Sequence, residues 1–368
     1  MRDFSTRVIE WQRVHGRHDM PWQNTRDPYR IWLSEIMLQQ TQVTTVLPYY
    51  LRFLQSFPDV AALARAPIDD VLAHWSGLGY YRRAHHLHAA ARVVMEAHDG
   101  VFPRDAVALE ALPGIGRSTA AAISSFSSGA CVAILDGNVK RVLARHAGIE
   151  GYPGAPKVEA ALWSAAESRL PRVADDGESE AYTQGMMDLG ATVCVRTSPR
   201  CELCPVNEDC VARVTHRTDS LPSPRPVKTV PQRAVRLLVI EHDGSLLFER
   251  RPAQGIWGGL WSLPECAMEE DPRGIALARF GIDAGTLHAL PPLEHGFTHF
   301  RLTMHAVRME VGAHAGNGAD RVLQRVAERD DLAWLATDAI DAAGLPAPIR
   351  RLVSSLDLSG FRLQPLSA

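Results

Sequence analysis

The sequence predicts a multidomain protein: an all-α region at residues 1–213, a linker at 214–233 and an α+β domain at 234–362. Three observations predict this order. Apolar residues recur at helical spacing in the first region, and the linker is basic and rich in proline, which favours an extended chain. Beyond it, apolar and polar residues alternate around an Asp-Gly pair, as in a β-hairpin. A length of 368 residues suffices for about two to three domains.

The composition is typical of a globular protein. Apolar residues make up 46% and charged residues 22% of the chain, which excludes a wholly disordered protein. No apolar run reaches the roughly 18 residues of a membrane span, and the N-terminal segment lacks the apolar stretch of a secretory signal. We therefore expect a cytoplasmic protein with no membrane partner. Because the net charge is −3, any surface that binds nucleic acid must be local.

Helical periodicity runs through the first region and is interrupted by proline or glycine. Gly100 follows a polar turn and is expected to end one helix, because glycine readily adopts the left-handed conformation of a C-cap. We expect helices at residues 28–57, 68–75, 82–100, 117–129, 138–148, 157–170 and 179–194.

The composition changes after the helical region. Residues 213–236 contain six arginine or lysine residues, four prolines and one acid, Asp219. This predicts an extended basic linker, although a loop lying on the surface would have the same composition. In the α+β domain, strands are expected at residues 234–240, 245–251 and 302–311, and short helices at 273–280 and 347–356.

Four of the six cysteines lie close together, with the spacing Cys194-x6-Cys201-x2-Cys204-x5-Cys210. A tight cluster in a long chain without a secretory signal favours a metal site over a disulfide framework. Four thiolates suit either zinc or a [4Fe-4S] cluster. Zinc ribbons usually contain two separate Cys-x2-Cys pairs, whereas this segment contains one.

A Pro-Gly-x-Gly turn precedes the helix expected at residues 117–129. No side chain shields the amides of Gly114 and Gly116, and free N–H groups at a helix N-terminus bind anions such as phosphate. A plain turn is the alternative. About twenty residues later, Asp136 precedes the next helix. It can act as the N-cap of that helix, and capping does not exclude a catalytic role for the same carboxylate.

Glu35 lies within an apolar helical segment. Ile31, Trp32 and Leu38 stand four and three residues before it and three after it, so they share its helix face. Burial among such neighbours would raise the pKa of the carboxyl and make it a general acid near neutral pH. The alternative is that Glu35 faces water or a partner helix.

Several ordered motifs together resemble the adenine DNA glycosylases of the MutY family, within the helix-hairpin-helix/GPD superfamily. The resemblance covers nearly all of residues 5–213, includes the cysteine spacing, and resumes in the second domain. The motifs are PYRIWLSEIMLQQTQV, GLGYYRRAHHLH, LPGIGRSTAAAI, ILDGNVKRVLAR, MMDLGATVC and, beyond the linker, GIWGGLWSLPE and GFTHF.

The resemblance implies a fold and a cofactor. The expected fold is an all-α helix-hairpin-helix core, formed by a six-helix barrel module and an iron–sulfur module, followed by a Nudix-like α+β domain. The cofactor is a [4Fe-4S] cluster in the loop 194–210. Its expected ligands are Cys194, Cys201, Cys204 and Cys210.

The resemblance also implies a reaction: hydrolysis of the bond between sugar and adenine in duplex DNA, where adenine is mispaired with 8-oxoguanine or guanine. The implied catalytic residues are Glu35, Asp136 and Asn138. The implied adenine pocket contains Trp22, Leu38, Gln184 and Ser118. The residues implied to contact DNA or 8-oxoguanine are Gln40, Thr41, Tyr80, Gly114, Gly116, Phe297, Thr298 and His299.

Three other functions are compatible with parts of the sequence. Endonuclease III-like pyrimidine glycosylases with lyase activity have a lysine where this chain has Ser118, and serine cannot form a Schiff base. A non-catalytic iron–sulfur sensor of DNA damage would not need both Glu35 and Asp136. A nucleotide hydrolase would need a glutamate-rich metal-binding helix, which residues 263–280 lack. No feature demands an oligomer, so we expect a monomer.

Overall fold

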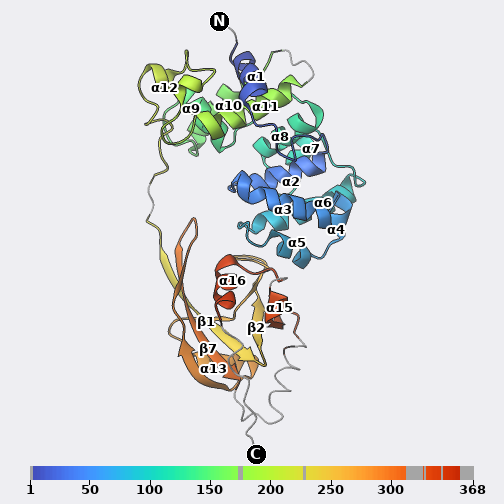
Figure 1. Ribbon diagram of the computed structural model, residues 1–368, viewed down its shortest axis with the longest axis vertical. Helices are drawn as coiled ribbons and strands as arrows, with labels where there is room; N and C mark the ends of the chain where they lie inside the picture. The colour runs from blue at the N-terminus through green and yellow to red at the C-terminus, as the bar shows by residue number, and fades with distance from the viewer. Residues whose placement is uncertain are drawn as a thin grey trace, which may run out of the picture. The chain divides into compact units, whose positions relative to one another are not determined.

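The structure is a computed structural model that describes residues 3–172, 177–226, 229–311, 326, 329–340 and 343–356. Contacts divide it into two compact units, one formed by residues 1–65 and 86–227 and the other by residues 66–85 and 228–368. Figure 1 shows that the first unit is helical and that the second contains a β-sheet. Linker residues 227 and 228, and the end of the second domain beyond residue 356, lie outside the described residues.

The first unit is all-α, as the sequence predicts. Its helices are α1 (Phe4–His15), α2 (Pro28–Leu38), α3 (Val43–Ser56), α4 (Val60–Arg65), α6 (Arg82–Ala97), α7 (Ala106–Glu110), α8 (Arg117–Ser128), α9 (Gly137–Ala147), α10 (Pro156–Glu167), α11 (Glu178–Asp188) and α12 (Val211–Val214). A π-helix, Leu189–Val193, follows α11, and a 3-10 turn, Cys201–Leu203, lies in the cysteine loop.

The prediction of one helix over residues 28–57 is wrong. The chain turns between α2 and α3, and Gln40 has a φ of 58°. A non-glycine residue in the left-handed region does not continue an α-helix. Apolar residues keep the helical spacing across this turn, which is why their periodicity does not reveal it.

Polar side chains fix where the helices of the site begin. Asp27 accepts a hydrogen bond from the backbone N of Tyr29 at 2.9 Å, and Pro28 occupies the first position of α2. Asp136 caps α9 by accepting from the backbone N of Val139 at 2.7 Å. The N-cap geometry expected for Asp136 is therefore confirmed.

Close packing of α1 against α11 depends on a glycine in the middle of α11. A Cβ atom at Gly185 would lie 2.8 Å from Cγ1 of Val8 and 3.0 Å from Cβ of Gln12. Val8 is fully buried, so its side chain has little room to move. The small residue thus brings α1 and α11 close together beside the cavity described below.

The second unit is an α+β domain around one mixed sheet. Strands β1 and β2 form the expected antiparallel hairpin, and β1 also pairs with β7 in parallel, from Gln232 opposite Arg301 to Glu241 opposite Glu310. The strands are β1 (Gln232–His242), β2 (Ser245–Arg250), β3 (Trp261–Ser262), β4 (Glu265–Cys266), β5 (Ala284–Ala289), β6 (Leu293–Gly296), β7 (Arg301–Val311) and β8 (Leu332–Ala336).

Helices complete the second unit. Two of them, α13 and α16, match the helices expected at residues 273–280 and 347–356. Helix α5 also belongs to this unit, where Oγ of the following Ser76 donates to the carbonyl of Leu345 at 2.9 Å. The helices are α5 (Ile68–Trp75), α13 (Pro272–Phe280), α15 (Thr337–Ile340) and α16 (Ala347–Ser354).

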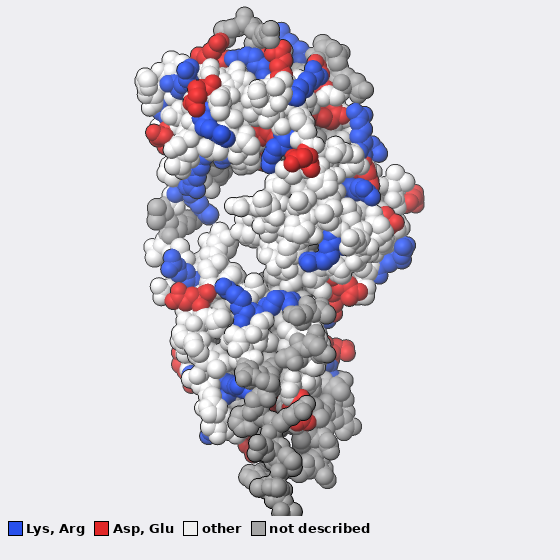
Figure 2. Space-filling model, in the orientation of Figure 1, with Lys and Arg blue, Asp and Glu red and all other residues white. Residues whose placement is uncertain are grey.

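None of the described helices is long and apolar enough to cross a membrane. On the face drawn in Figure 2, lysine and arginine side chains lie among aspartate and glutamate side chains over both units. This mixed distribution agrees with the net charge of −3. Attraction for a polyanion must therefore come from local groups of basic residues.

Gly185→Ala should destabilise the first unit. The added methyl group would press on Val8 and Gln12, so we expect the free energy of unfolding to fall by about 1–3 kcal/mol. Urea denaturation of the full chain measures this change. Gly137→Ala is the matched control, because a Cβ there would meet no atom within 4 Å. An unchanged midpoint for Gly185→Ala would contradict the proposed packing.

Candidate active site

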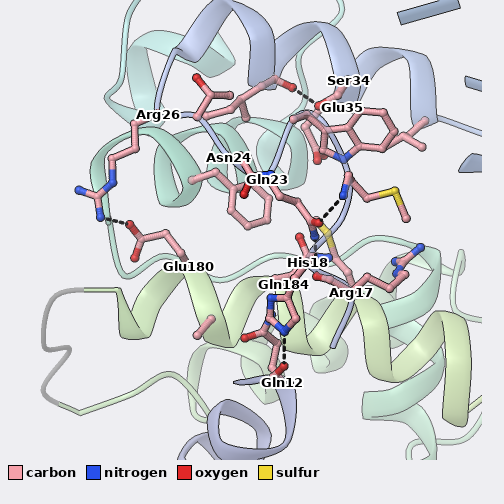
Figure 3. A pocket seen from close by; sticks show the side chains of 18 of the residues that line it. Gln12, Arg17, His18, Gln23, Asn24, Arg26, Ser34, Glu35, Glu180 and Gln184 are labelled. Carbon is pink, nitrogen blue, oxygen red and sulfur yellow. Dashed lines mark hydrogen bonds and ion pairs between the residues drawn. The ribbon is translucent and has the colours of Figure 1, made fainter. Parts of the chain in front are cut away.

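A cavity of about 540 Å3 opens between the end of α1, the loop that follows it, α2, α8 and α11. Its volume lies in the usual range for small-molecule sites, roughly 300–1,000 Å3. Glu35 lines it, together with three residues expected in the adenine pocket: Trp22, Leu38 and Gln184. In Figure 3, Glu35 comes from α2 at the top of the view and Gln184 from α11 at the bottom, so they stand on opposite walls.

Glu35 is a carboxyl group in an unfavourable environment for charge. Glu35 is itself half-buried, because its side chain borders the cavity, while its neighbours in α2, Ser34 and Ile36, are buried. The described part of the chain gives its carboxyl no hydrogen-bond partner. Desolvation by burial, together with the negative charge of Asp136, raises the pKa of Glu35 to about 8. The side chain is therefore mostly protonated at neutral pH and can donate a proton into the cavity.

The carboxyl of Asp136, unlike that of Glu35, is held by hydrogen bonds from the described residues. Its Oδ1 accepts from the backbone N of Val139 at 2.7 Å, and its Oδ2 accepts from Nδ2 of Asn138 at 3.3 Å. Burial raises the pKa of Asp136, while hydrogen bonds from the backbone amides of Val139 and Asn138 oppose that rise. The site thus pairs the carboxyl of Glu35, which has no partner in the described part of the chain, with the hydrogen-bonded carboxyl of Asp136.

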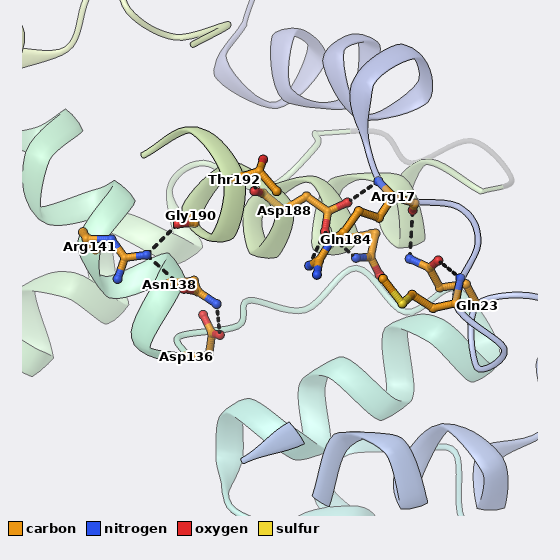
Figure 4. A network of polar contacts seen from close by, with 10 residues as sticks. Arg17, Gln23, Asp136, Asn138, Arg141, Gln184, Asp188, Gly190 and Thr192 are labelled. Atoms are coloured by element: carbon orange, nitrogen blue, oxygen red, sulfur yellow. Dashed lines mark hydrogen bonds and ion pairs between the residues drawn. The ribbon is translucent and has the colours of Figure 1, made fainter. Parts of the chain in front are cut away.

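A polar network continues from Asp136 towards the cysteine loop (Figure 4). Oδ1 of Asn138 accepts from Nη2 of Arg141 at 2.9 Å, and the same guanidinium donates to the carbonyls of Gly190 at 2.6 Å and Cys194 at 2.7 Å. A Cβ at Gly190 would lie 2.9 Å from the backbone oxygen of Asn138, so the contact requires glycine. Sequence reasoning missed Arg141, because an arginine on a helix resembles an ordinary solvated charge.

Ser118 lies beside the chain that leads to Asp136 and does not belong to the cavity wall. Its Oγ accepts a hydrogen bond from the backbone N of Leu135 at 2.9 Å. The hydroxyl thus anchors the residue directly before Asp136. In this position Ser118 can fix the backbone that carries the carboxylate.

The residues expected to contact DNA lie on turns. Gln40 and Tyr80 have positive φ angles of 58° and 50°, and Tyr80 is 49% exposed. Thr41 occupies the same turn as Gln40, and its Oγ1 donates to the carbonyl of Gln39 at 3.3 Å. Side chains held on such turns can project into a ligand while the helices stay rigid.

The two hairpin glycines differ in geometry. Gly114 has a φ of 77°, and a Cβ there would lie 2.5 Å from Cβ of His86. Gly116 is the N-cap of α8, and a Cβ there would meet no atom within 4 Å. Only Gly114 is therefore required as glycine by its surroundings, and Gly116 leaves the first amides of α8 open.

In the second unit, an aromatic cluster supports the loop expected to read 8-oxoguanine. The ring of Phe297 stacks on Phe300 with centroids 4.6 Å apart, and it lies 5.4 Å from Trp257. The backbone N of Phe297 donates to the carbonyl of Phe300 at 2.9 Å, which closes the turn. Thr298 and His299, at the tip, are exposed.

The four clustered cysteines line one small apolar cavity. Nη1 of Arg145 lies 3.4 Å from Sγ of Cys194 and donates to the carbonyl of Val195 at 2.7 Å. Burial raises the pKa of Cys204 to about 12, so four thiolates here would need a positively charged centre. Among the described residues, no group of three or more potential ligands is arranged to hold a single metal ion.

Sequence reasoning also missed a group of polar contacts around Asp188, beside the cavity. Arg17, which is half-buried, forms an ion pair with the fully buried Asp188, with Nη2 2.6 Å from Oδ1. Gln184 donates to the same carboxylate (Figure 4). The spacing of Gln184 and Asp188, four residues apart on α11, is the only local signal for this arrangement.

Comparisons with known proteins agree with this architecture. Residues 33–168 match the model of the HhH-GPD superfamily base excision DNA repair proteins, and residues 235–355 match the NUDIX domain. An adenine DNA glycosylase of Buchnera aphidicola from Acyrthosiphon pisum is 34% identical over 97% of this chain and 99% of its own. The human adenine DNA glycosylase is 33% identical over 82% of this chain and 65% of its own.

The helical part also resembles solved structures. A thermostable thymine-DNA glycosylase superposes with a TM-score of 0.52 at 30% identity, covering 58% of this chain and 95% of that one. The likeness supports the helical fold of the first unit.

Glu35→Gln should stabilise the protein at alkaline pH. The folded state raises the pKa of Glu35 from 4.5 to about 8, so it retains a proton that the unfolded state releases, and wild-type stability falls as pH rises through this window. At pH 9 we expect the variant to be more stable by roughly 2–4 kcal/mol, with a smaller difference at pH 5. Urea denaturation at both pH values measures this.

The control for that experiment is Glu96→Gln, because the Glu96 side chain is 67% exposed. Its stability relative to wild type should vary little between the two pH values. A difference between Glu35→Gln and wild type that is independent of pH would contradict the desolvated state of Glu35.

Proposed function

The chain belongs to the family of adenine DNA glycosylases, and on this premise we propose that it hydrolyses the N-glycosidic bond of adenine mispaired with 8-oxoguanine or guanine in duplex DNA. Such hydrolysis starts base excision repair. The observation that best supports this proposal is the carboxyl of Glu35, which lines a base-sized cavity and has a pKa raised to about 8.

The chemistry follows from the two carboxyl groups. The target base must leave the duplex stack to enter the cavity. Adenine departs poorly as an anion, so Glu35 donates its proton to N7 and allows a neutral base to leave. As the bond breaks, positive charge develops on the sugar, and Asp136 stabilises it or bonds transiently to C1′. Glu35, now a carboxylate, takes a proton from the attacking water.

The neighbours of Asp136 act as positioning residues. Asn138 donates to Oδ2 of Asp136, and Arg141 holds Asn138 in turn. Ser118 stands where related lyases carry a lysine, so this site has no amine there to attack the sugar. This supports hydrolysis without strand cleavage and disfavours an endonuclease III-like lyase.

Recognition of the opposing base is assigned to other segments. We infer that Gln40, Thr41 and Tyr80 contact the duplex around the mispair, and that the loop of Phe297, Thr298 and His299 reads 8-oxoguanine. The exposure of Tyr80, Thr298 and His299 supports these roles. The NUDIX-like domain would serve binding rather than hydrolysis, since α13, the helix that follows the segment GIWGGLWSLPE, contains no glutamate.

We also propose that Cys194, Cys201, Cys204 and Cys210 hold a [4Fe-4S] cluster. The four thiols share one apolar cavity, and the soft, anionic donor set suits iron–sulfur chemistry. When bound, the cluster would cross-link the loop 194–210. Arg145 would then neutralise part of the charge of the thiolates.

The proposed reaction is tested by base release from duplexes that differ in one pair. The full chain should release adenine opposite 8-oxoguanine and opposite guanine, and should leave thymine glycol intact. Release of thymine glycol without release of adenine would favour the pyrimidine glycosylase instead. Single-turnover quantification of free base and of abasic sites provides the measurement.

Glu35→Gln is the control variant of that assay. The glutamine side chain has nearly the same shape as glutamate but cannot donate an acidic proton. We therefore expect the rate of adenine release to fall by about 10²–10⁴-fold. Binding to the mispaired duplex should change little. Release at the wild-type rate would reject Glu35 as the general acid.

Freshly purified protein should be yellow-brown and should contain about four iron atoms per chain. The visible absorption spectrum, with its charge-transfer bands, and an iron analysis test this expectation. Cys204→Ser should lower the iron content, whereas Cys131→Ser, at an exposed cysteine away from the cluster loop, should not. A colourless preparation that contains only zinc would contradict the cluster assignment.

A further inference from the structure

Asp188 is a fully buried carboxylate that the reaction described above does not use. It lies behind the cavity wall, at the end of α11. Arg17 holds it on one side: the backbone N of Arg17 donates to Oδ2 at 2.9 Å, and Nε donates to Oδ1 at 2.7 Å. Figure 4 shows this clamp.

Gln184, one helical turn before Asp188, is the next partner. Its Nε2 donates to Oδ1 of Asp188 at 2.9 Å. An ion-paired carboxylate offers only acceptor atoms, so the nitrogen end of the amide must face Asp188 and the carbonyl end must point away. Within the described residues, Oε1 of Gln184 receives no hydrogen bond.

Gln184 lines the cavity, on the wall opposite Glu35 (Figure 3). We propose that Asp188, clamped by Arg17, is a positioning residue that fixes the Gln184 amide with its oxygen towards the cavity. The cavity therefore selects purines with an amino group at C6 over purines with an oxygen there. This inference rests on the proposed function and adds a source of base specificity to it.

The chemistry of the base follows from that orientation. Adenine carries a hydrogen-bond donor at C6, whereas hypoxanthine and guanine carry an acceptor. Oε1 of Gln184 accepts a hydrogen bond from the amino group of adenine. With hypoxanthine, the same atom would face the oxygen at C6, and two acceptors form no hydrogen bond. Because the nitrogen end of the amide is turned towards Asp188, Gln184 also does not compete with Glu35 as a donor to N7.

The test compares release of adenine and of hypoxanthine, each opposite guanine in the same duplex, by the full chain. The quantity compared between variant and wild type is the ratio of the adenine rate to the hypoxanthine rate. A general loss of activity lowers both rates and cancels in this ratio. The intrinsic difference between the two leaving groups is the same in every variant and cancels in the comparison with wild type. In Asp188→Ala the amide can rotate, so we expect the ratio to fall by about tenfold or more.

Thr192→Val is the matched control. Oγ1 of Thr192 donates to the backbone carbonyl of Asp188 at 2.7 Å, so its removal disturbs the same turn but leaves the carboxylate in place. Its rate ratio should stay within about twofold of wild type. If Asp188→Ala lowers both rates and leaves their ratio unchanged, Asp188 is merely structural and the proposal is overturned.

A second pair of variants tests the orientation of the amide even where Asp188→Ala does not fold. In Gln184→Glu, the new carboxyl shares a proton with Asp188 and still presents an oxygen to the cavity, so the ratio should stay within about threefold of wild type. Gln184→Met removes the acceptor and should lower the ratio by about tenfold or more. A tenfold change in Gln184→Glu would show that the amide nitrogen faces the cavity, which overturns the inference.

The wild-type chain separates this inference from the proposed function. Wild-type release of adenine, combined with an unchanged ratio in both Asp188→Ala and Gln184→Met, overturns only the inference. Failure of the wild-type chain to release adenine from either mispair overturns the proposed function and the inference together.

Discussion

A protonated carboxyl that receives no hydrogen bond from the described residues is the constraint on which the site depends. Water would stabilise the charged form of Glu35, so the surrounding helices must limit its contact with solvent while the cavity stays open to a ligand. Asp136 adds a second negative charge nearby, which further favours the neutral form of Glu35. The fold therefore keeps two acids close together and assigns the proton to the one without partners.

Much of this arrangement is encoded locally and could be predicted. The burial of Glu35 follows from apolar residues at helical spacing, and the cap formed by Asp136 follows from an aspartate directly before a helix. The spacing of the cysteines likewise indicates a shared ligand. In the second unit, an Asp-Gly pair between apolar runs predicts the β1–β2 hairpin, which the structure confirms.

Other features depend on contacts between distant segments and leave no local pattern. Arg17 and Asp188 are 171 residues apart, and Arg141 reaches the carbonyl of Cys194 across 53 residues. The parallel pairing of β1 with β7 is equally non-local. The turn at Gln40 is different: it is local, but the apolar periodicity continues through it and hides the change in backbone conformation.

Asp136 caps α9, and in the proposed reaction the same carboxylate also stabilises the sugar. The two roles differ in what they require of the side chain. The cap of α9 needs only a short side chain with an acceptor, and asparagine or serine meets that need as well as aspartate. The proposed catalytic role needs the negative charge. A single nucleotide change in the codon, from aspartate to asparagine, would therefore keep the helix intact while silencing the reaction. Inactive descendants of such a protein can therefore arise without passing through a misfolded intermediate.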